Sequence, residues 1–456
     1  MTASTAVSIE TIPRDMYSLI VQYLSRADYN NLYASSKDCN RLCKTVDPPW
    51  PSRCFGAQGS HAIESFSISH DGEYFAYANT IGNIEVWSRR TGKLIMPFKQ
   101  KGRSASQSRR QTPIGNLLKF APKGYLLACG HENRIYLFDV AVAVKTKILS
   151  SCCKIITIDQ HQGTCYEVTY LSFSKDAQKL IVRYGKMAYI YQIPAHGLST
   201  VACQLLNQIP LTSSRCQMAS SPCMKYVAVT NSSSSDEKGT IDVWNLEGLS
   251  TANESQPPIQ EILDATRINA HRNQVIRGLA FVSCTDPMGE NHWVVSCSLR
   301  GSVKFHRRYG QAGSEALYIC THEFESPGKI FSMALSSPFC PPEHHDERMY
   351  LAVGQSRGQV RVWKVNLLND QSQDHNQEEL DQRKVIKSQQ PTTESTDMNS
   401  SSNDILQEFL STEVGEHMHH DNIKLLAFSP DGRNLVASRA FEGRIWFHKF
   451  SPGITG

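Results

Sequence analysis

Arginine and lysine side chains are the groups of this sequence that could do chemistry together, because they recur beside turns between apolar, strand-like segments. The members of this set are Arg183, Lys186, Arg300, Arg357 and Arg439. Converging guanidinium groups bind carboxylates or phosphates in a bidentate manner, which lysines alone do less specifically. One interpretation is a positive rim that binds an acidic or phosphorylated peptide. The other is a solvated surface that carries charges where turns usually have them.

A second basic group lies in one loop and consists of Lys99, Lys101, Arg103, Arg109 and Arg110. This loop would join the same rim. It contains no interleaved aromatic residues of the kind that stack on bases, so nucleic-acid binding is a minor option. A localisation signal and a flexible tether are equally compatible with it.

Catalytic and metal-binding patterns are weak. The histidines that cluster in sequence are His344, His345, His417, His419 and His420. They have no cysteine or carboxylate at ligand spacing, so loop residues are a better interpretation than a metal site. There is no Gly-x-Ser-x-Gly elbow and no Gly-rich phosphate loop. The sequence therefore predicts a protein that is not an enzyme and has no cofactor or metal.

A six-residue sequence pattern, which we call the phrase, recurs seven times. The structure that it forms must position the basic residues named above. The first copy of the phrase is Gly82-Asn83-Ile84-Glu85-Val86-Trp87, and its later copies begin near residues 133, 186, 239, 301, 358 and 443. The third and fifth residues are mostly large or branched and apolar, which predicts a strand with one buried face. The leading glycine suits a tight turn with positive φ.

A second phrase precedes each copy, as in Ile63-x-x-Phe66-x-Ile68 followed by His70-Asp71-Gly72 and an apolar run. Each unit therefore reads as three strands, and a fourth, outer strand follows most of them. One such sheet cannot bury both of its faces, whereas several sheets stacked around an axis can. The chain resembles the WD-repeat β-propellers over about residues 50–456. The resemblance implies a mainly-β fold with seven blades at 61–456.

The repeats depart from that family in their polar network. Tryptophan occupies the terminal aromatic position only at Trp87, Trp244 and Trp363, although His271 and His419 lie near the family's histidine position. We expect repeats held mainly by apolar packing.

Residues 8–45 have a different, helical character. Ile12, Met16, Ile20 and Leu24 recur at intervals of four and give one apolar helix face, with Pro13 in the first turn. Three short helices cannot form a self-sufficient core, so this unit needs a partner or the following domain. The spacing from Ile12 to Leu24, with Leu32 further on, resembles the F-box motif. The resemblance implies that Ile12, Pro13, Met16, Ile20, Leu24 and Leu32 bind the Skp-family adaptor of a cullin–RING ubiquitin ligase.

Two further segments complete the predicted domain plan. Residues 46–60 read as a proline-containing linker, and Arg53 to Gln58 could supply the outer strand that the last blade lacks. The insertion at 366–414 is polar and acidic, and we expect it to be disordered. It carries ten acidic and three basic residues, a net charge of −7, so the rest of a chain of net charge +4 carries +11.

Composition agrees with a protein of the cytoplasm or nucleus. Fourteen cysteines without regular spacing, and no secretory or membrane-spanning segment, favour reduced thiols. The function predicted from the sequence is a substrate receptor of an SCF-type (Skp–cullin–F-box) ubiquitin ligase, with the adaptor on the helices and a substrate segment on the propeller. The alternative is a non-catalytic WD-repeat scaffold with no ligase role. Neither involves a membrane.

Overall fold

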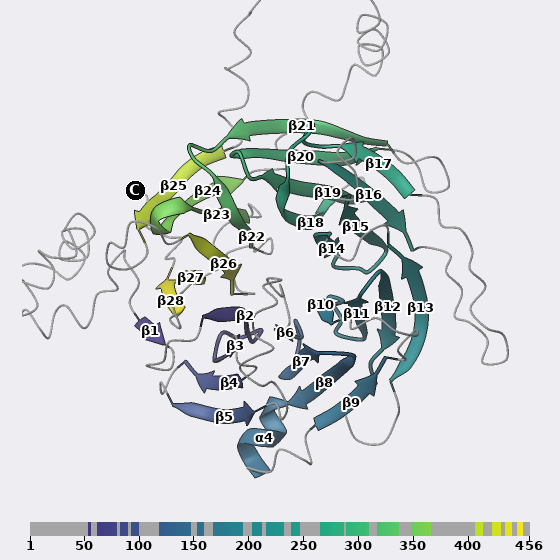
Figure 1. Cartoon of the computed structure of the whole chain (residues 1–456), viewed down its shortest axis with the longest axis vertical. Coiled ribbons are helices and arrows are strands. Elements are labelled where there is room, and N and C mark those ends of the chain that lie inside the picture. Colours follow the sequence, from purple (N-terminus) through teal and green to yellow (C-terminus); the bar gives the residue numbers. More distant parts are fainter. Residues whose placement is uncertain are drawn as a thin grey trace, which may run out of the picture.

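Seven four-stranded sheets follow one another around a common centre in the computed structural model (Figure 1). The structure describes residues 53–55, 62–79, 83–89, 93–99, 118–146, 153–158, 167–194, 203–211, 216–231, 239–246, 265–286, 289–309, 317–336, 349–365, 406–413, 422–429, 434–439 and 445–449. Neighbouring strands within a sheet are antiparallel. The predicted mainly-β propeller is confirmed. The predicted helical unit at 8–45 lies outside the described residues.

The sheets are numbered here in chain order, and each strand list runs from the centre to the perimeter. Sheet 1 consists of β2 (Ile63–Ile68), β3 (Tyr74–Asn79), β4 (Asn83–Ser88) and β5 (Leu94–Lys99). Sheet 2 consists of β6 (Leu118–Phe120), β7 (Leu126–His131), β8 (Arg134–Asp139) and β9 (Cys153–Thr157). Sheet 3 consists of β10 (Val168–Phe173), β11 (Lys179–Tyr184), β12 (Met187–Gln192) and β13 (Gln204–Pro210). Sheets 4 and 5 are β14 (Met218–Ser220), β15 (Tyr226–Thr230), β16 (Thr240–Asn245) and β17 (Ala265–Asn269); β18 (Ile276–Asp286), β19 (Gly289–Ser298), β20 (Ser302–Tyr309) and β21 (Leu317–Glu325). Sheets 6 and 7 are β22 (Ile330–Leu335), β23 (Met349–Gln355), β24 (Gln359–Val365) and β25 (Leu406–Glu413); β26 (Ile423–Phe428), β27 (Asn434–Arg439), β28 (Ile445–Lys449) and β1 (Arg53–Phe55).

Two helical elements occur in the described part of the chain. The α-helix α4 (Val140–Thr146) follows β8 and buries Val140 and Ala143. The 3-10 turn η4 (Ser356–Gly358) joins β23 to β24. No helix among the described residues is long and apolar enough to cross a bilayer.

The repeated phrase forms the third strand of each sheet, and its apolar positions are the buried ones. In β4 the burial alternates residue by residue, with Ile84 and Val86 inside. The second strands are buried along most of their length, and β15 and β23 along all of it, because both of their faces are covered by neighbouring sheets. This two-sided burial is what the stacking of sheets around an axis requires.

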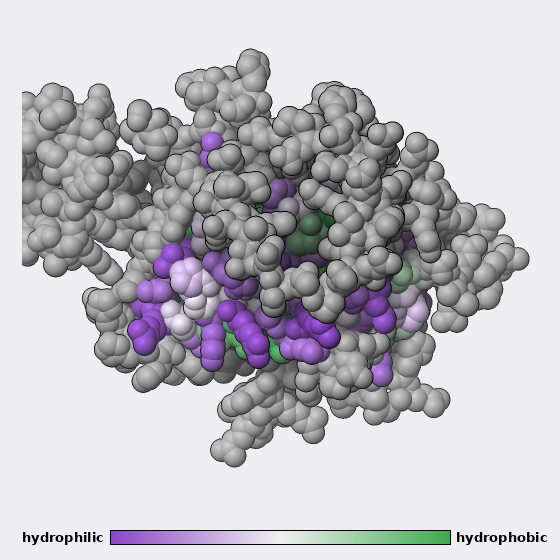
Figure 2. Space-filling model, turned by 90° about the horizontal axis from the view of Figure 1, so that it is seen from above, coloured by the Kyte–Doolittle hydropathy of each residue, from purple (hydrophilic) through white to green (hydrophobic). Residues whose placement is uncertain are grey.

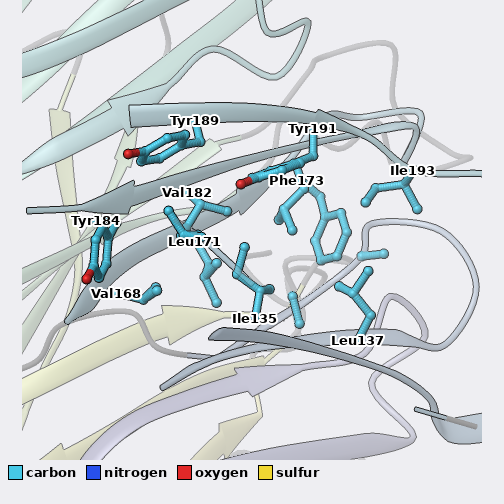
Figure 3. Packing of buried hydrophobic residues seen from close by; sticks show 14 residues of the cluster. Ile135, Leu137, Val168, Leu171, Phe173, Val182, Tyr184, Tyr189, Tyr191 and Ile193 are labelled. Carbon is cyan, nitrogen blue, oxygen red and sulfur yellow. The ribbon is translucent and has the colours of Figure 1, made fainter. Parts of the chain in front are cut away.

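Apolar clusters join neighbouring sheets. Between sheets 2 and 3, Ile135 and Leu137 of β8 point toward Leu171, Phe173 and Val182 of sheet 3 (Figure 3). The tyrosines of β12, Tyr189 and Tyr191, belong to the same cluster. Stacking energy in this fold therefore comes mainly from side chains packed between sheets, as the degenerate repeats predicted.

The ring closes through a strand from far away in the sequence. Of the segment 53–58 that was expected to complete the last blade, residues 53–55 form β1, which pairs with β28 through Arg53↔Phe447, Cys54↔Trp446 and Phe55↔Ile445. Residues 56–58 lie outside the described part. In Figure 1, β1 lies at the outer edge of sheet 7, beside β28.

The insertion predicted at 366–414 is wrong at its C-terminal end. Residues 406–413 form β25, which pairs with β24 and is the outer strand of sheet 6. Apolar residues at Leu406, Phe409 and Leu410 interrupt the polar composition there, and the free edge of β24 offers backbone partners. Residues 366–405 and 414 lie outside the described part.

Candidate functional site

The turns between second and third strands share one rim of the ring with the segments that enter the first strands. In sheet 5, the backbone N–H of Leu299 donates to the carbonyl of Val275 (2.9 Å), which ties the β19–β20 turn to the entry of β18. The N–H of Ile330 donates in turn to the carbonyl of Leu299 (3.3 Å), which ties the same turn to the entry of sheet 6. These bonds connect the rim from sheet 5 to sheet 6. We call this rim of the ring the turn rim.

The five basic residues predicted for this rim divide into two groups. Lys186, Arg300 and Arg357 are exposed and lie in the turns of sheets 3, 5 and 6. Arg183 and Arg439 are only 7% and 2% exposed. The expectation that all five present free cationic groups is therefore wrong for Arg183 and Arg439, because second strands are enclosed on both faces.

Arg183 has a structural role between sheets 3 and 4. Its Nε donates to Thr169 Oγ1 (2.6 Å), and its Nη1 contacts the carbonyl oxygen and, at 3.2 Å, the Sγ of Cys216. Burial of this guanidinium is compensated by these acceptors. The same contact acts on Cys216: burial raises the pKa of its thiol, and Arg183 partly opposes that effect.

Arg357 reaches the rim through an uncommon backbone conformation. Its φ is 61°, in the left-handed region, within η4. Gln355 precedes this turn at the end of β23, and its Nε2 donates to Ser326 Oγ (3.1 Å) while its Oε1 accepts from Arg361 Nε (3.2 Å). This buried amide thus ties the two strands that flank the turn, β23 and β24, to the segment that enters sheet 6.

A second set of rim residues was not found from the sequence. In five first strands the register shifts at a β-bulge one residue after a buried Ile or Val. The extra residues at these bulges are Glu64, Thr169, Arg277, Phe331 and Lys424. Each is partly or fully exposed, whereas the preceding residue is buried. Bulges re-aim side chains and are common beside functional sites, so each of these sheets presents one extra side chain where its inner strand begins at the rim.

The charge of these bulge residues varies around the ring. Lys424 of sheet 7 lies close enough to Glu64 of sheet 1 for the carboxylate to favour its charged form, but burial dominates and lowers the pKa of Lys424. Arg277 of sheet 5 is exposed. Phe331 of sheet 6 lies between them in chain order and is partly exposed.

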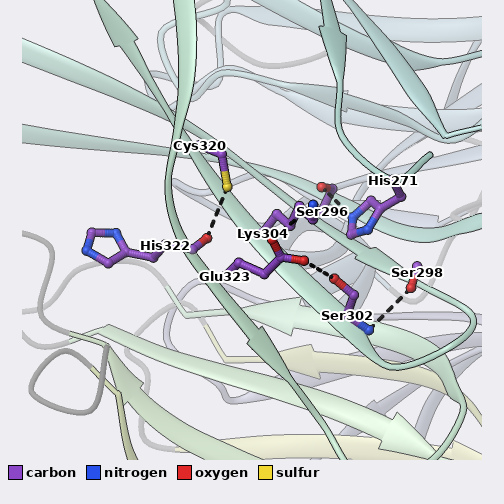
Figure 4. Close-up of polar contacts among 8 residues, drawn as sticks. All are labelled: His271, Ser296, Ser298, Ser302, Lys304, Cys320, His322 and Glu323. Carbon is purple, nitrogen blue, oxygen red and sulfur yellow. Dashed lines mark hydrogen bonds and ion pairs between the residues drawn. The ribbon is translucent and has the colours of Figure 1, made fainter. Parts of the chain in front are cut away.

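A polar cluster joins the segment that enters sheet 5 to the strands β19, β20 and β21 (Figure 4). His271 Nε2 is 3.0 Å from Ser296 Oγ, and Lys304 Nζ pairs with Glu323 Oε2 at 3.0 Å. Ser302 connects the strands: its Oγ donates to Glu323 Oε1 (3.1 Å), and its N–H donates to Ser298 Oγ (3.2 Å). His271 was expected near the histidine position of the WD-repeat pattern, and its side chain forms a hydrogen bond with Ser296.

Two histidines of this sheet are held neutral. Burial, with a further contribution from Lys304, lowers the pKa of His271 to about 4. Burial also lowers the pKa of His306 to about 4, assisted by His271 and Lys304. Neither ring nitrogen of His306 has a hydrogen-bond partner among the described residues. Protonation of these two buried histidines should therefore destabilise the fold at acidic pH.

The other predicted site residues lie outside the described part of the chain. They include the adaptor-binding set Ile12, Pro13, Met16, Ile20, Leu24 and Leu32, the loop residues Lys101 to Arg110, and the histidines at 344, 345, 417, 419 and 420. Lys99 ends β5, and its side chain is not described. Within the described residues there is no group of three or more His, Cys, Asp or Glu arranged to hold a metal ion.

Solved structures share this architecture. One match is to a chain of the "Crystal Structure of Mitotic Checkpoint Complex", with a TM-score of 0.54 and 14% identity, covering 89% of this chain and 93% of that chain. At this identity the likeness shows the fold alone. The fold itself is widely used, since 1462 chains of solved structures match, so it does not select one activity. No family model matches the chain. No curated protein matches it either.

Proposed function

We propose that this chain is a non-catalytic recognition subunit whose propeller holds a segment of another protein. The observation that carries the proposal is the enclosure of each sheet by its neighbours, which leaves the two rims and the outer strands as the surfaces open to partners. In the edge-on view of Figure 2, the described surface is mainly hydrophilic, and hydrophobic side chains appear only in small recessed areas. Binding through polar turns therefore suits this molecule better than burial of a large apolar face.

The finer form of the proposal is a substrate receptor of an SCF-type ubiquitin ligase that acts in the cytoplasm or nucleus. It is supported by the F-box-like spacing from Ile12 to Leu32 directly before a propeller. In this role the helices bind the Skp-family adaptor with its cullin, and the propeller binds the substrate. The chain itself performs no chemistry, and its contribution is a high effective concentration of substrate near the transfer machinery.

A WD-repeat scaffold without a ligase role is the second candidate. The motif departs from the F-box pattern at Ser35 and Cys39, where valine and tryptophan are usual. In that case the N-terminal helices only cover part of the propeller, and several partners assemble on the rims.

A pull-down with the Skp-family adaptor separates the two candidates. The intact chain is compared with a variant that carries Ile20→Asp and Leu24→Asp, on the predicted apolar helix face. A matched control carries Ser18→Asp and Gln22→Asp, which add the same charge on the opposite face. Capture by the intact chain and the control, and its loss in the first variant, would support the ligase receptor, because a few apolar anchors dominate such interfaces. No capture by the intact chain would leave the scaffold.

A further inference from the structure

Five cationic side chains and one aromatic side chain occupy one arc of the turn rim. We call this set the basic arc, and its members are Arg277, Arg300, Lys329, Phe331, Arg357 and Lys424. Arg277 and Arg300 come from sheet 5, Lys329, Phe331 and Arg357 from sheet 6, and Lys424 from sheet 7. Arg277, Arg300, Lys329 and Arg357 are exposed, and Phe331 and Lys424 are partly exposed. The sequence grouped only Arg300 and Arg357, because the other four lie at strand entries and bulges.

Backbone contacts connect the members of the arc. The turn that carries Arg300 accepts a hydrogen bond from Ile330, which lies between Lys329 and Phe331. Gly301 of the same turn has a φ of 113°, and a Cβ there would lie 2.8 Å from the carbonyl oxygen of Gly328. The arc thus runs without interruption from sheet 5 into sheet 6.

The same continuity extends from sheet 6 into sheet 7. Ser332 Oγ donates to the carbonyl oxygen of Ile423 (2.8 Å), the residue before Lys424. The turn η4, with Arg357, also contacts β26. Figure 1 shows β18, β22 and β26 as successive inner strands around the centre of the ring, so the arc extends over three neighbouring inner strands.

The cations of the arc are available to a ligand. Among the described residues, the side chains of Arg277, Arg300 and Arg357 make no hydrogen bond or ion pair. Two acidic residues of sheet 5 lie on its outer strand: Glu323, which pairs with Lys304, and Glu325, which is opposite Ser302. Glu64 of sheet 1 acts on Lys424 at one end of the arc, and the three arginines of the arc keep their charge unpaired within the described part of the chain.

Equivalent positions on the opposite side of the ring carry acidic groups. Glu132 occupies the turn of sheet 2 that corresponds to Arg300 and Arg357. Glu167 precedes β10, where Lys329 precedes β22. Lys119 and Lys186 are also present there, so that side is mixed in sign. The turn rim is thus polarised, with positive charge gathered over sheets 5 to 7.

We propose that the basic arc binds an unphosphorylated, acidic peptide segment of a partner protein, with one apolar side chain of that segment on Phe331. This inference rests on the proposed function, since it takes the propeller as the part that recognises protein. The cations come singly or in pairs from three successive sheets, an arrangement that fits several separate carboxylates along an extended segment. A phosphate group needs several donors that converge on one point. Single-stranded nucleic acid needs a series of stacking aromatics, and the described arc contains only Phe331.

The experiment measures binding of short fluorescent peptides by anisotropy to the full chain. The main probe alternates Glu and Gly around a central Leu. Comparison probes replace every Glu by Gln, replace Leu by Gly, or contain one phosphoserine in place of the acidic residues, and a single-stranded oligodeoxythymidine is the last probe. The arc variant carries Arg277→Glu, Arg300→Glu and Arg357→Glu. The matched control carries Lys123→Glu, Lys145→Glu and Lys175→Glu, which are exposed residues of the opposite rim and of α4.

We expect the Glu–Leu peptide to bind the intact chain and the control alike, and the arc variant at least about tenfold more weakly. Its affinity falls with added salt, and the Gln and Gly probes bind more weakly than the parent. Equal binding to the arc variant, or binding only of the phosphorylated probe or the oligonucleotide, overturns the proposal. If the triple variant does not fold, Arg300→Gln with Arg357→Gln gives the same comparison in exposed turns. Adaptor capture is read separately: its loss without loss of peptide binding refutes the ligase role alone.

Discussion

Close backbone contacts between neighbouring sheets require glycine at particular positions of the turn rim. Gly239 has a φ of 88°, and a Cβ at this position would overlap with the carbonyl group of His271, at the entry of the next sheet. The N–H of His271 donates to the carbonyl of Gly239 (2.8 Å), so the two backbones approach each other directly. The leading glycine of the repeated phrase is therefore needed for this contact as well as for its positive φ.

Gly239→Ala is predicted to destabilise the fold by about 2 to 4 kcal/mol, because the added methyl must displace backbone as well as adopt a left-handed conformation. Gly124→Ala is the matched control: its φ of 68° is similar, but nothing lies within 4 Å of the added Cβ. The control should lose only about 1 kcal/mol. Chemical denaturation of both variants measures the difference, and equal losses would show that the contact with His271 contributes nothing.

Acid should weaken the fold through His271 and His306. Their pKa of about 4 in the folded protein lies below the ordinary histidine pKa of 6.5, so the unfolded chain binds more protons between these two values. The free energy of unfolding therefore falls as the pH drops through 6.5 toward 4 and levels off below. We compare the free energy of unfolding of His306→Phe with that of the parent at pH 5 and at pH 7. The difference, variant minus parent, should be larger at pH 5 by about 1 to 2 kcal/mol. Denaturation curves at the two pH values test this, and a pH-independent difference would contradict it.

At the scale of elements, the recurring bulge explains the spacing of the second phrase. In Ile63-x-x-Phe66-x-Ile68 the first interval is odd, whereas a regular strand places residues of one face at even intervals. The bulge at Glu64 absorbs the extra residue, so Ile63, Phe66 and Ile68 are all buried. The odd interval was visible in the sequence and predicts the bulge, and with it the positions of Arg277, Phe331 and Lys424.

Deleting Phe331 should leave the register of β22 unchanged. Ile330 and Ser332 already pair with the consecutive residues Gln355 and Gly354, so without the bulge they become direct neighbours on opposite faces and Ile330 stays buried. We expect the deletion and the replacement Phe331→Ser each to lose about 1 kcal/mol or less, because only an extra, partly exposed residue changes. Urea denaturation of both variants measures the losses. A loss of about 2 to 4 kcal/mol for the deletion alone, comparable to emptying a buried isoleucine site, would mean that the strand slips without its bulge.

The sequence predicted the elements better than it predicted the candidate site. Period-two patterns define the third strands, and the described residues of all seven copies of the phrase lie on third strands or directly before them. Burial of Arg183 was also predictable in principle, since the run Leu180-Ile181-Val182 before it indicates a strand enclosed on both faces. The grouping of Lys329 with Arg300 was not, because it depends on a hydrogen bond between different repeats.

On the scale of the whole molecule, both ends of the described chain meet in sheet 7. The strand β1 contributes three paired positions to β28, and no other described strand covers that edge. An uncovered edge in a closed ring leaves backbone groups unpaired and available for association with another chain. The N-terminal segment thus has two roles. Its predicted helical unit would bind the adaptor, and the strand β1 that follows completes the last sheet.

Truncation separates these two tasks. A chain that begins at residue 46 keeps β1 and should melt within about 1 °C of the full chain, although it loses adaptor capture. A chain that begins at residue 62 lacks β1, and loss of its ladder bonds, each contributing about 1 kcal/mol, should lower the Tm by at least about 3 °C. The exposed edge of β28 should also increase self-association, which light scattering at several protein concentrations measures. Equal Tm values for the two truncated chains would mean that the ring is held by packing between sheets 7 and 1, and that the pairing of β1 adds no stability.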